Sequence, residues 1–147
     1  MQDGVKVSGC LSVFLKDGSG RVLKSVEVSN LVVNGGRALI AARLAGVGTV
    51  PNPVSHMALG AGSTAASGTD TALEDELGRV ALTSKTVNGN IITHEATVPA
   101  GVATGALNEA GLFNDASGGT LVARTRFPTI NKTAGQEVTL VWRIIIG

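Results

Sequence analysis

A glycine-rich segment is the first place in this sequence where residue types and spacing match a binding chemistry. Gly60-Ala61-Gly62-Ser63-Thr64-Ala65 fits the G-x-G-x-x-A pattern that holds a dinucleotide pyrophosphate after a strand. That chemistry needs a helix whose N-terminus begins at the glycines and faces the phosphates. Residues 66–70 have no apolar periodicity that would hold such a helix on a sheet. We therefore expect a flexible surface loop and no cofactor.

The two histidines are the next candidates for chemistry. His56 and His94 each lie in a segment that is typical of a strand. A zinc site needs ligands that converge, and the HxxE, HExxH and CxxC spacings are absent. His94 and Glu95 are neighbours on a strand, so their side chains point to opposite faces and form no dyad. We expect hydrogen-bonded or solvent-facing histidines and no metal.

Other reactive or charged residues also have simpler interpretations. A serine nucleophile needs an elbow such as G-x-S-x-G, which does not occur. Glu74-Asp75-Glu76 suits the start of a helical turn better than a cation site. Asp17-Gly18-Ser19-Gly20 lacks the ligand series of an EF-hand and predicts a turn. Cys10, the lone cysteine, is expected to be a small core or half-buried filler. The sequence predicts no catalytic residue, and hence no enzyme.

The charge balance argues against several classes of partner. The formal net charge is +1 and aromatic residues make up 3%, so neither a strong field nor stacking platforms are available for nucleic acid. Arg124 and Arg126 share one face of a predicted strand and, with Arg79, Arg21 or Lys132, suggest a modest basic patch. This patch is either a solvated or ion-paired face or a contact for an acidic protein.

Bulk composition predicts one domain with a core of its own. The chain has 147 residues, of which 44% are hydrophobic, and its 20 glycines indicate many tight turns. The N-terminus has no basic segment followed by an apolar run, so we expect no secretory signal. No apolar stretch reaches about 18 residues, so we expect no membrane span.

The last third of the chain carries the clearest strand pattern. Leu121, Ala123, Thr125 and Phe127 alternate with Val122, Arg124 and Arg126, which predicts a strand with one buried and one wet face. In the final segment, Val138 to Ile146, the residues near the end are apolar on both faces of the predicted strand. It should lie inside a sheet or between layers, so the C-terminus completes the fold.

The first third predicts a hairpin followed by a helix. Val5 to Lys16 and Arg21 to Ser29 flank a turn, and Gly9 marks a bulge or a break after a short arm, residues 1–8. A helix is expected over about 35–45, with Asn34 as N-cap and Gly46 as left-handed C-terminal residue. Its apolar stripe would consist of Leu39, Ile40 and Leu44.

The middle of the chain predicts a strand, a helical turn and a second hairpin. Ser55 to Leu59 reads as a short strand, and Thr71 with Glu74 matches a capping box for a helical turn over 71–77. Arg79 to Val87 and Asn90 to Val98 flank Asn88-Gly89, which favours a type I′ turn. With eight or nine strands and one capping helix, we predict an all-β antiparallel sandwich or jelly roll, with residues 9–147 as one domain.

Several segments together resemble small structural proteins of tailed bacteriophages. The segments are Asn30 to Arg37 running into Leu39-Ile40-Ala41, Ser55 to Gly60 with Gly62 to Ala66, Asp70 to Leu73 with Glu76-Leu77 and Arg79, and Glu109 to Asn114 with Gly118 to Leu121 and Arg124. The chain is most similar to capsid decoration, or cement, proteins with a jelly-roll fold. This resemblance implies a homo-oligomer, expected to be a dimer, that is bound over the major capsid protein on the outer surface of the virion. It implies no catalytic residue.

Two other functions stay open. Similar segments occur in phage tail and fibre-associated proteins, so a module that recognises a receptor or a glycan is the alternative. An enzyme would need a cleft where His56, His94, Glu95, Glu109 or Asp115 converge. For the decoration function, we expect Val5, Lys6, Val7, Arg124 and Arg126 to contact the capsid or a second copy. The arm would add a strand to the edge of a neighbouring sheet.

Overall fold

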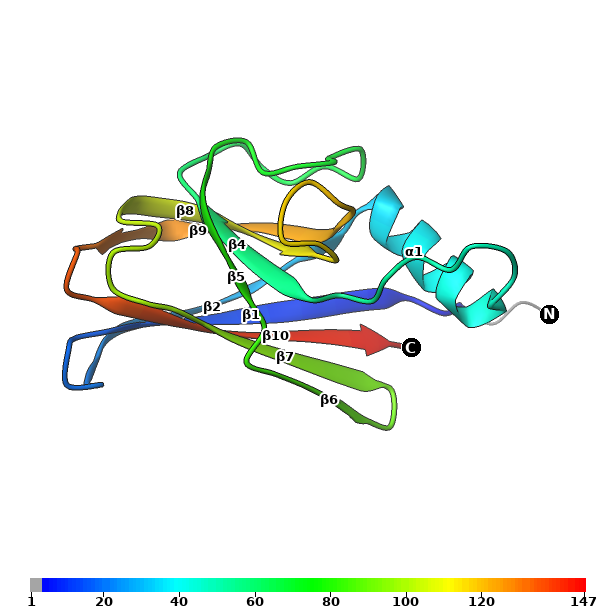
Figure 1. The fold of residues 1–147 in the computed structure, drawn as a ribbon, viewed down its shortest axis with the longest axis horizontal. Coiled ribbons are helices and arrows are strands. Elements are labelled where there is room, and N and C mark those ends of the chain that lie inside the picture. The colour runs from blue at the N-terminus through cyan, green and yellow to red at the C-terminus, as the bar shows by residue number, and fades with distance from the viewer. Residues whose placement is uncertain (1–3) are drawn as a thin grey trace.

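The C-terminal strand lies at the centre of a sheet, as its hydrophobic pattern predicts. The structure is a computed structural model that describes residues 4–147. These residues form two five-stranded antiparallel sheets and one helix, an all-β sandwich of jelly-roll-like form (Figure 1). In the first sheet the order is β2 (Val22–Ser29), β1 (Val7–Lys16), β10 (Glu137–Ile146), β7 (Ile91–Val98) and β6 (Ser84–Asn88).

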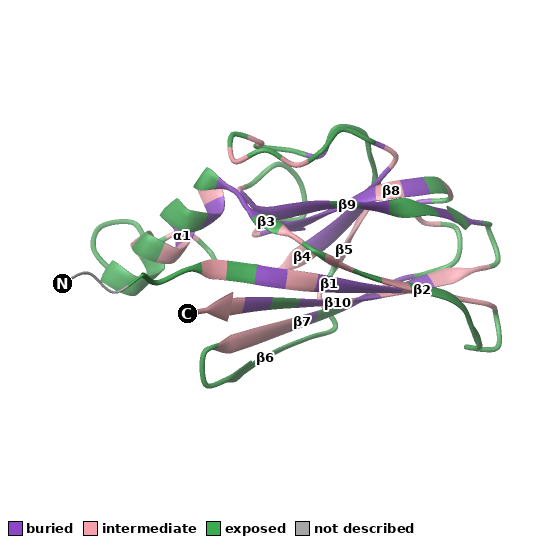
Figure 2. Cartoon of the chain, turned by 180° about the vertical axis from the view of Figure 1, so that it is seen from behind, coloured by how far each residue is buried: buried purple, intermediate pink, exposed green. Residues whose placement is uncertain are grey.

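The second sheet packs face to face on the first. Its order is β3 (Leu31–Val32), β9 (Leu121–Lys132), β8 (Gly105–Phe113), β4 (His56–Gly60) and β5 (Glu76–Ala81). Alternate residues of β10 point inward, and Leu140, Trp142 and Ile144 are buried among the side chains of the facing sheet. Figure 2 shows burial along β1, β8, β9 and β10, whereas β2 and β6 at the sheet edges are more exposed. Among the described residues, no helix is long and apolar enough to cross a membrane.

The first strand runs through Gly9 without a break, contrary to the predicted interruption. β1 pairs with β10 in one continuous register from Val7 to Lys16. Gly9 is buried: its carbonyl oxygen accepts the Asn30 N–H, and a Cβ here would meet Asn30 and the backbone of β10 at Arg143. Of the predicted arm, residues 1–3 lie outside the described part of the chain, Gly4 to Lys6 precede the strand, and residues 7–8 belong to it.

The helix α1 (Asn34–Ala45) closes one end of the sandwich close to the predicted bounds. Gly46 adopts the left-handed conformation at φ 63°, as expected. The N-cap is Val33 rather than Asn34, because Val33 is extended and its carbonyl accepts the Arg37 N–H, while Asn34 is already helical. Leu39 is buried, but Leu44 is 87% exposed, so the predicted apolar stripe does not extend to the last turn.

The central hairpin is confirmed, although its turn lies one residue further along. Asn88 pairs with Ile91, so Gly89 and Asn90 form the two-residue loop. Gly89 has a φ of +60°, whereas Asn90 has no positive φ, which is the pattern of a type II′ turn rather than type I′. The predicted strand from Arg79 to Val87 is divided: β5 belongs to the second sheet and β6 to the first.

The helical turn predicted over residues 71–77 is wrong. Residues 71–75 are irregular, and the chain enters β5 at Glu76. The N–H groups of Glu74 and Asp75 are bound by the Glu109 carboxylate, a partner distant in sequence, so they need no capping box. This long-range contact outweighs the local preference for a turn of helix.

Candidate functional site

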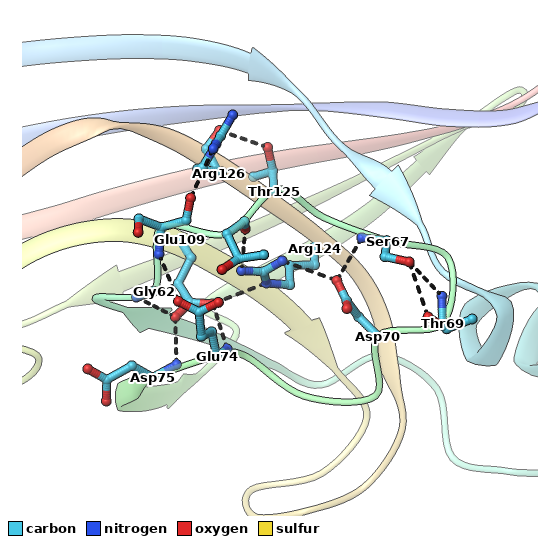
Figure 3. Close-up of polar contacts among 12 residues, drawn as sticks. Gly62, Ser67, Thr69, Asp70, Glu74, Asp75, Glu109, Arg124, Thr125 and Arg126 are labelled. Atoms are coloured by element: carbon cyan, nitrogen blue, oxygen red, sulfur yellow. Dashed lines mark hydrogen bonds and ion pairs between the residues drawn. The ribbon is translucent and has the colours of Figure 1, made fainter.

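Glu109 is the centre of the most concentrated polar cluster in the protein. It lies on β8, and its carboxylate is fully buried. Glu109 Oε2 accepts the N–H groups of Gly62 at 2.6 Å and Asp75 at 2.8 Å, and Oε1 accepts the N–H of Glu74 at 2.9 Å (Figure 3). Three backbone N–H groups therefore take the place of water around a carboxylate that solvent does not reach.

Arg124 neutralises that carboxylate from the neighbouring strand β9. Its Nε donates to Glu109 Oε1 at 3.1 Å, Nη1 to Asp70 Oδ2 at 3.1 Å and Nη2 to the Thr64 carbonyl at 2.9 Å (Figure 3). The side chain is 2% exposed. The wet face predicted for this strand is therefore wrong at Arg124, because the loop of residues 61–75 covers it.

The cluster fixes the glycine-rich loop that joins β4 to β5. A Cβ at Gly62 would lie 2.8 Å from the Glu109 carboxyl carbon and would also clash with Glu74. Glycine is therefore needed because a carboxylate of the same chain approaches the backbone closely. The expected surface loop is confirmed, but it is held to the sheet by charge-assisted hydrogen bonds. The anion bound by its Gly62 N–H is the Glu109 side chain rather than a pyrophosphate.

The expected basic patch is smaller than the sequence suggests. Arg126 is exposed, and its Nη1 donates to the Ser63 carbonyl at 2.9 Å. Lys132 is buried, and its Nζ donates to the Pro99 carbonyl at 3.0 Å; burial lowers the pKa of this amine. Arg79 lies with its Cζ 3.6 Å from the Phe113 ring centroid and pairs with Glu76. Arg124 and Lys132 are therefore not part of an exposed patch.

The N-terminal residues of the predicted interface lie in a different sheet from the two arginines. Val5 is 67% exposed, Lys6 accepts the Gly147 N–H through its carbonyl, and Val7 begins β1 in the first sheet. Arg124 and Arg126 belong to β9 in the second sheet. The structure thus does not bring these five residues into one cluster, and their contact with a partner stays a prediction.

The histidines have separate environments. His56 Nδ1 lies 2.7 Å from Ser55 Oγ. His94 is buried between the sheets, and its Nδ1–H donates to the Trp142 carbonyl at 3.0 Å, while Glu95 is exposed, as the alternation predicts. Burial, together with the nearby charge of Lys85, lowers the His94 pKa, although its bond to the Trp142 carbonyl acts in the opposite direction. The lowered pKa favours the neutral form of His94.

Two of the residues named for an active site, His94 and Glu109, lie in different places. His94 faces the core between the sheets, whereas Glu109 lies beneath the 61–75 loop. Cys10 is half-buried on β1. Within residues 4–147, no group of three or more histidine, cysteine or acidic side chains is placed to hold a metal ion. The Glu74-Asp75-Glu76 segment contributes backbone N–H groups to Glu109 instead.

Two hollows lie on either side of the segment that leads into β4, and sequence reasoning missed both. The first, of about 480 Å³, is lined by residues 52–55, Leu82, Ser84, Lys85 and Asn114. The second, of about 330 Å³, lies between α1 and the strands β6 and β7, with mostly apolar walls. Lys85 borders both hollows. Their residues come from seven separate segments of the chain, so no local pattern could have predicted them.

Comparison with known proteins identifies no relative of this chain. The chain matches no protein family, no curated protein and no solved structure.

Proposed function

We propose that this chain is a structural virion protein that binds the outer surface of an assembled bacteriophage capsid and stabilises the lattice of the major capsid protein. The observation that carries the proposal is a group of exposed apolar side chains at one end of a rigid sandwich. Leu44 is 87% exposed, Val47 is 79% exposed and Val5 is 67% exposed. The C-terminal end of α1 and the start of β1, which Val5 shortly precedes, lie at the same end of the long axis (Figure 1).

Exposure of these side chains is unfavourable unless another surface covers them. Each leaves apolar surface in contact with water, and burying that surface is favourable by about 25 cal/mol per Å². In a single copy of the protein, three such side chains make only a weak contact. The contact becomes strong when many copies bind a repeated lattice. A protein that binds only the assembled shell stabilises that shell by mass action. The resemblance to decoration proteins points in the same direction.

The buried ionisable groups, together with the half-buried Asp70, also support a structural role. Glu109, Arg124 and Asp70 fasten a loop, and Lys132 and His94 each bind a backbone carbonyl. Each of these contacts is made within the fold and stabilises it. A stiff domain with an apolar end suits a protein that bridges subunits of a shell.

The proposal is tested with phage particles that lack this protein. They should release their DNA at a lower temperature than complete particles, and adding the purified protein should restore the difference. The double variant Leu44→Asp, Val47→Asp should fail to restore it. Val22→Asp is the matched control, since Val22 is 48% exposed at the opposite end of the sandwich, and it should restore stability.

Two results would contradict the proposal. Particles without the protein that withstand heat as well as complete ones would exclude a cement role. Labelled protein that is found at the tail rather than over the shell would favour the alternative, a tail or fibre module that recognises a receptor or a glycan.

A further inference from the structure

The cavity between α1 and the first sheet has the form of a small-molecule site. Its volume, about 330 Å³, lies at the lower end of the range for ligand pockets, about 300–1,000 Å³. The helix contributes one wall and the strands β6 and β7 the other, while residues from β9 and β10 complete the lining. The apolar side chains that line it are Leu39, Ile40, Pro53, Val54, Val87, Ile92, Val122 and Ile144.

Two cations border this apolar space, and neither has an acidic partner among residues 4–147. Arg43 Nη1 donates to the Pro51 carbonyl at 2.7 Å, and Lys85 Nζ donates to the Val54 carbonyl at 2.7 Å. Both side chains are thus fixed to one short segment of backbone. Each keeps further N–H donors, because a guanidinium has five and an ammonium three. None of the described residues that line the cavity is acidic.

Among the described residues, the only other polar side chain of the lining is His94, and burial favours its neutral form by lowering its pKa. Its Nδ1–H is used by the Trp142 carbonyl, so Nε2 carries no proton. The cavity therefore combines an apolar interior, a neutral imidazole and two positive charges near solvent. A ligand that matches this distribution has an aliphatic chain and one anionic end.

We propose that this cavity binds a monoanionic amphiphile whose aliphatic chain lies against Ile92, Val122 and Ile144 and whose anionic group lies between Arg43 and Lys85. A methylene group occupies about as much liquid volume as a water molecule, roughly 30 Å³, so the cavity holds a chain of about eight to ten carbons. Neither Leu44, Val47 nor Val5 lines this cavity, and the inference does not depend on capsid binding.

The direct test is titration of the purified protein with decanoate below its micelle concentration. Isothermal titration calorimetry gives the affinity, and methyl NMR spectra locate the site through the resonances of Ile92 and Ile144. Decanoate should bind at one site and shift those methyl signals. Decanol, which has the same chain without charge, should bind about tenfold more weakly or less, because the charge-assisted hydrogen bonds are lost. Decyl sulfate should bind like decanoate, which would show that the site selects charge rather than a carboxylate.

Variants at the rim separate charge from shape. Arg43 and Lys85 are both exposed, so Arg43→Gln with Lys85→Gln should leave the fold intact and weaken decanoate at least tenfold. Arg43→Lys, the matched control, should keep most of the affinity. Val87→Glu, on the exposed edge strand β6, should weaken decanoate by supplying a competing anion. The proposal is overturned if decanoate fails to bind at millimolar concentration, if decanol binds equally well, or if the double variant keeps full affinity.

Discussion

Glu109 and Arg124, 15 residues apart, form an ion pair of 3.1 Å in which both side chains are closed off from solvent. Removing the charge of Glu109 would leave the buried guanidinium with Asp70, whose side chain is partly exposed, in place of its fully buried anionic partner. We expect Glu109→Gln to lower the free energy of unfolding by about 3 kcal/mol, the usual cost of breaking a buried pair from one side. Chemical denaturation followed by Trp142 fluorescence measures this change.

The same pair predicts a specific coupling. Arg124→Met combined with Glu109→Gln removes both charges, so the double variant should lose less stability than the two single variants added together. A double-mutant cycle should give a coupling of at least about 1 kcal/mol. Strict additivity would mean that the two side chains act independently, and the structural role given to the pair would be wrong.

Arg79 makes a second set of contacts that lysine cannot reproduce. Its guanidinium pairs with both oxygens of Glu76, donates to the Asp115 and Gly118 carbonyls, and stacks on the Phe113 ring. A lysine keeps the charge but loses the planar fork. Arg79→Lys should therefore cost about 1–2 kcal/mol of stability in thermal or chemical unfolding.

A matched substitution distinguishes the loss of the Arg79 contacts from a general effect of replacing arginine with lysine. Arg37→Lys changes an exposed residue of α1 and should alter stability by less than about 0.5 kcal/mol. Equal effects at the two positions would contradict the proposed importance of the Phe113 stacking and the carbonyl contacts.

Local periodicity predicted the strands that alternate along their own length. The β1–β2 hairpin, the β6–β7 hairpin and the buried strand β10 follow from period two and from turn residues, both of which act within a few residues. The apolar content of β10 required a central position, and the sheet order gives it one. The fold class was predictable for this reason.

The errors arise where a distant residue determines the local structure. A capping box at Thr71 suggested a helical turn, but Glu109 binds the Glu74 and Asp75 N–H groups. Arg124 looked solvent-facing because its strand alternates, yet the loop residues that bind it, Asp70 and Thr64, are 54 and 60 positions away in the sequence. The cavity has the same origin, since its lining comes from α1 and four strands. Patterns within one segment carry no information on such contacts.

The two glycines in the first turn of α1 give a test of close packing. Alanine normally stabilises a helix by about 1 kcal/mol relative to glycine. At Gly36, however, a Cβ would lie 2.8 Å from the Val122 carbonyl carbon and closer still to its oxygen, on the backbone of β9. We expect Gly36→Ala to destabilise the protein by about 2 kcal/mol, because the helix must move away from the sheet.

Gly35 is the control for this effect. A Cβ there would lie 3.2 Å from the Leu121 carbonyl oxygen and 3.4 Å from a Thr120 methyl group, so a small shift suffices. Gly35→Ala should change stability by less than about 1 kcal/mol, since the gain in helix propensity offsets the tighter contact. Similar values for the two variants in thermal unfolding would show that α1 does not pack as closely on β9 as described.

His94 makes the stability of the protein depend on pH. Its pKa in the folded state is lowered from the ordinary value of 6.5, mainly by burial. Below pH 6.5 the unfolded chain therefore binds a proton at this residue that the folded chain does not. The free energy of unfolding should fall as the pH drops from 6.5 toward the folded pKa, by at most about 1.4 kcal/mol per pH unit, and His94 should make no such contribution above 6.5.

Chemical denaturation at pH 7.5 and pH 5.5 measures the loss. His94→Gln should reduce it, whereas His56→Gln, which removes the other histidine, should retain it. An unchanged pH dependence in His94→Gln would show that the buried imidazole is not its source.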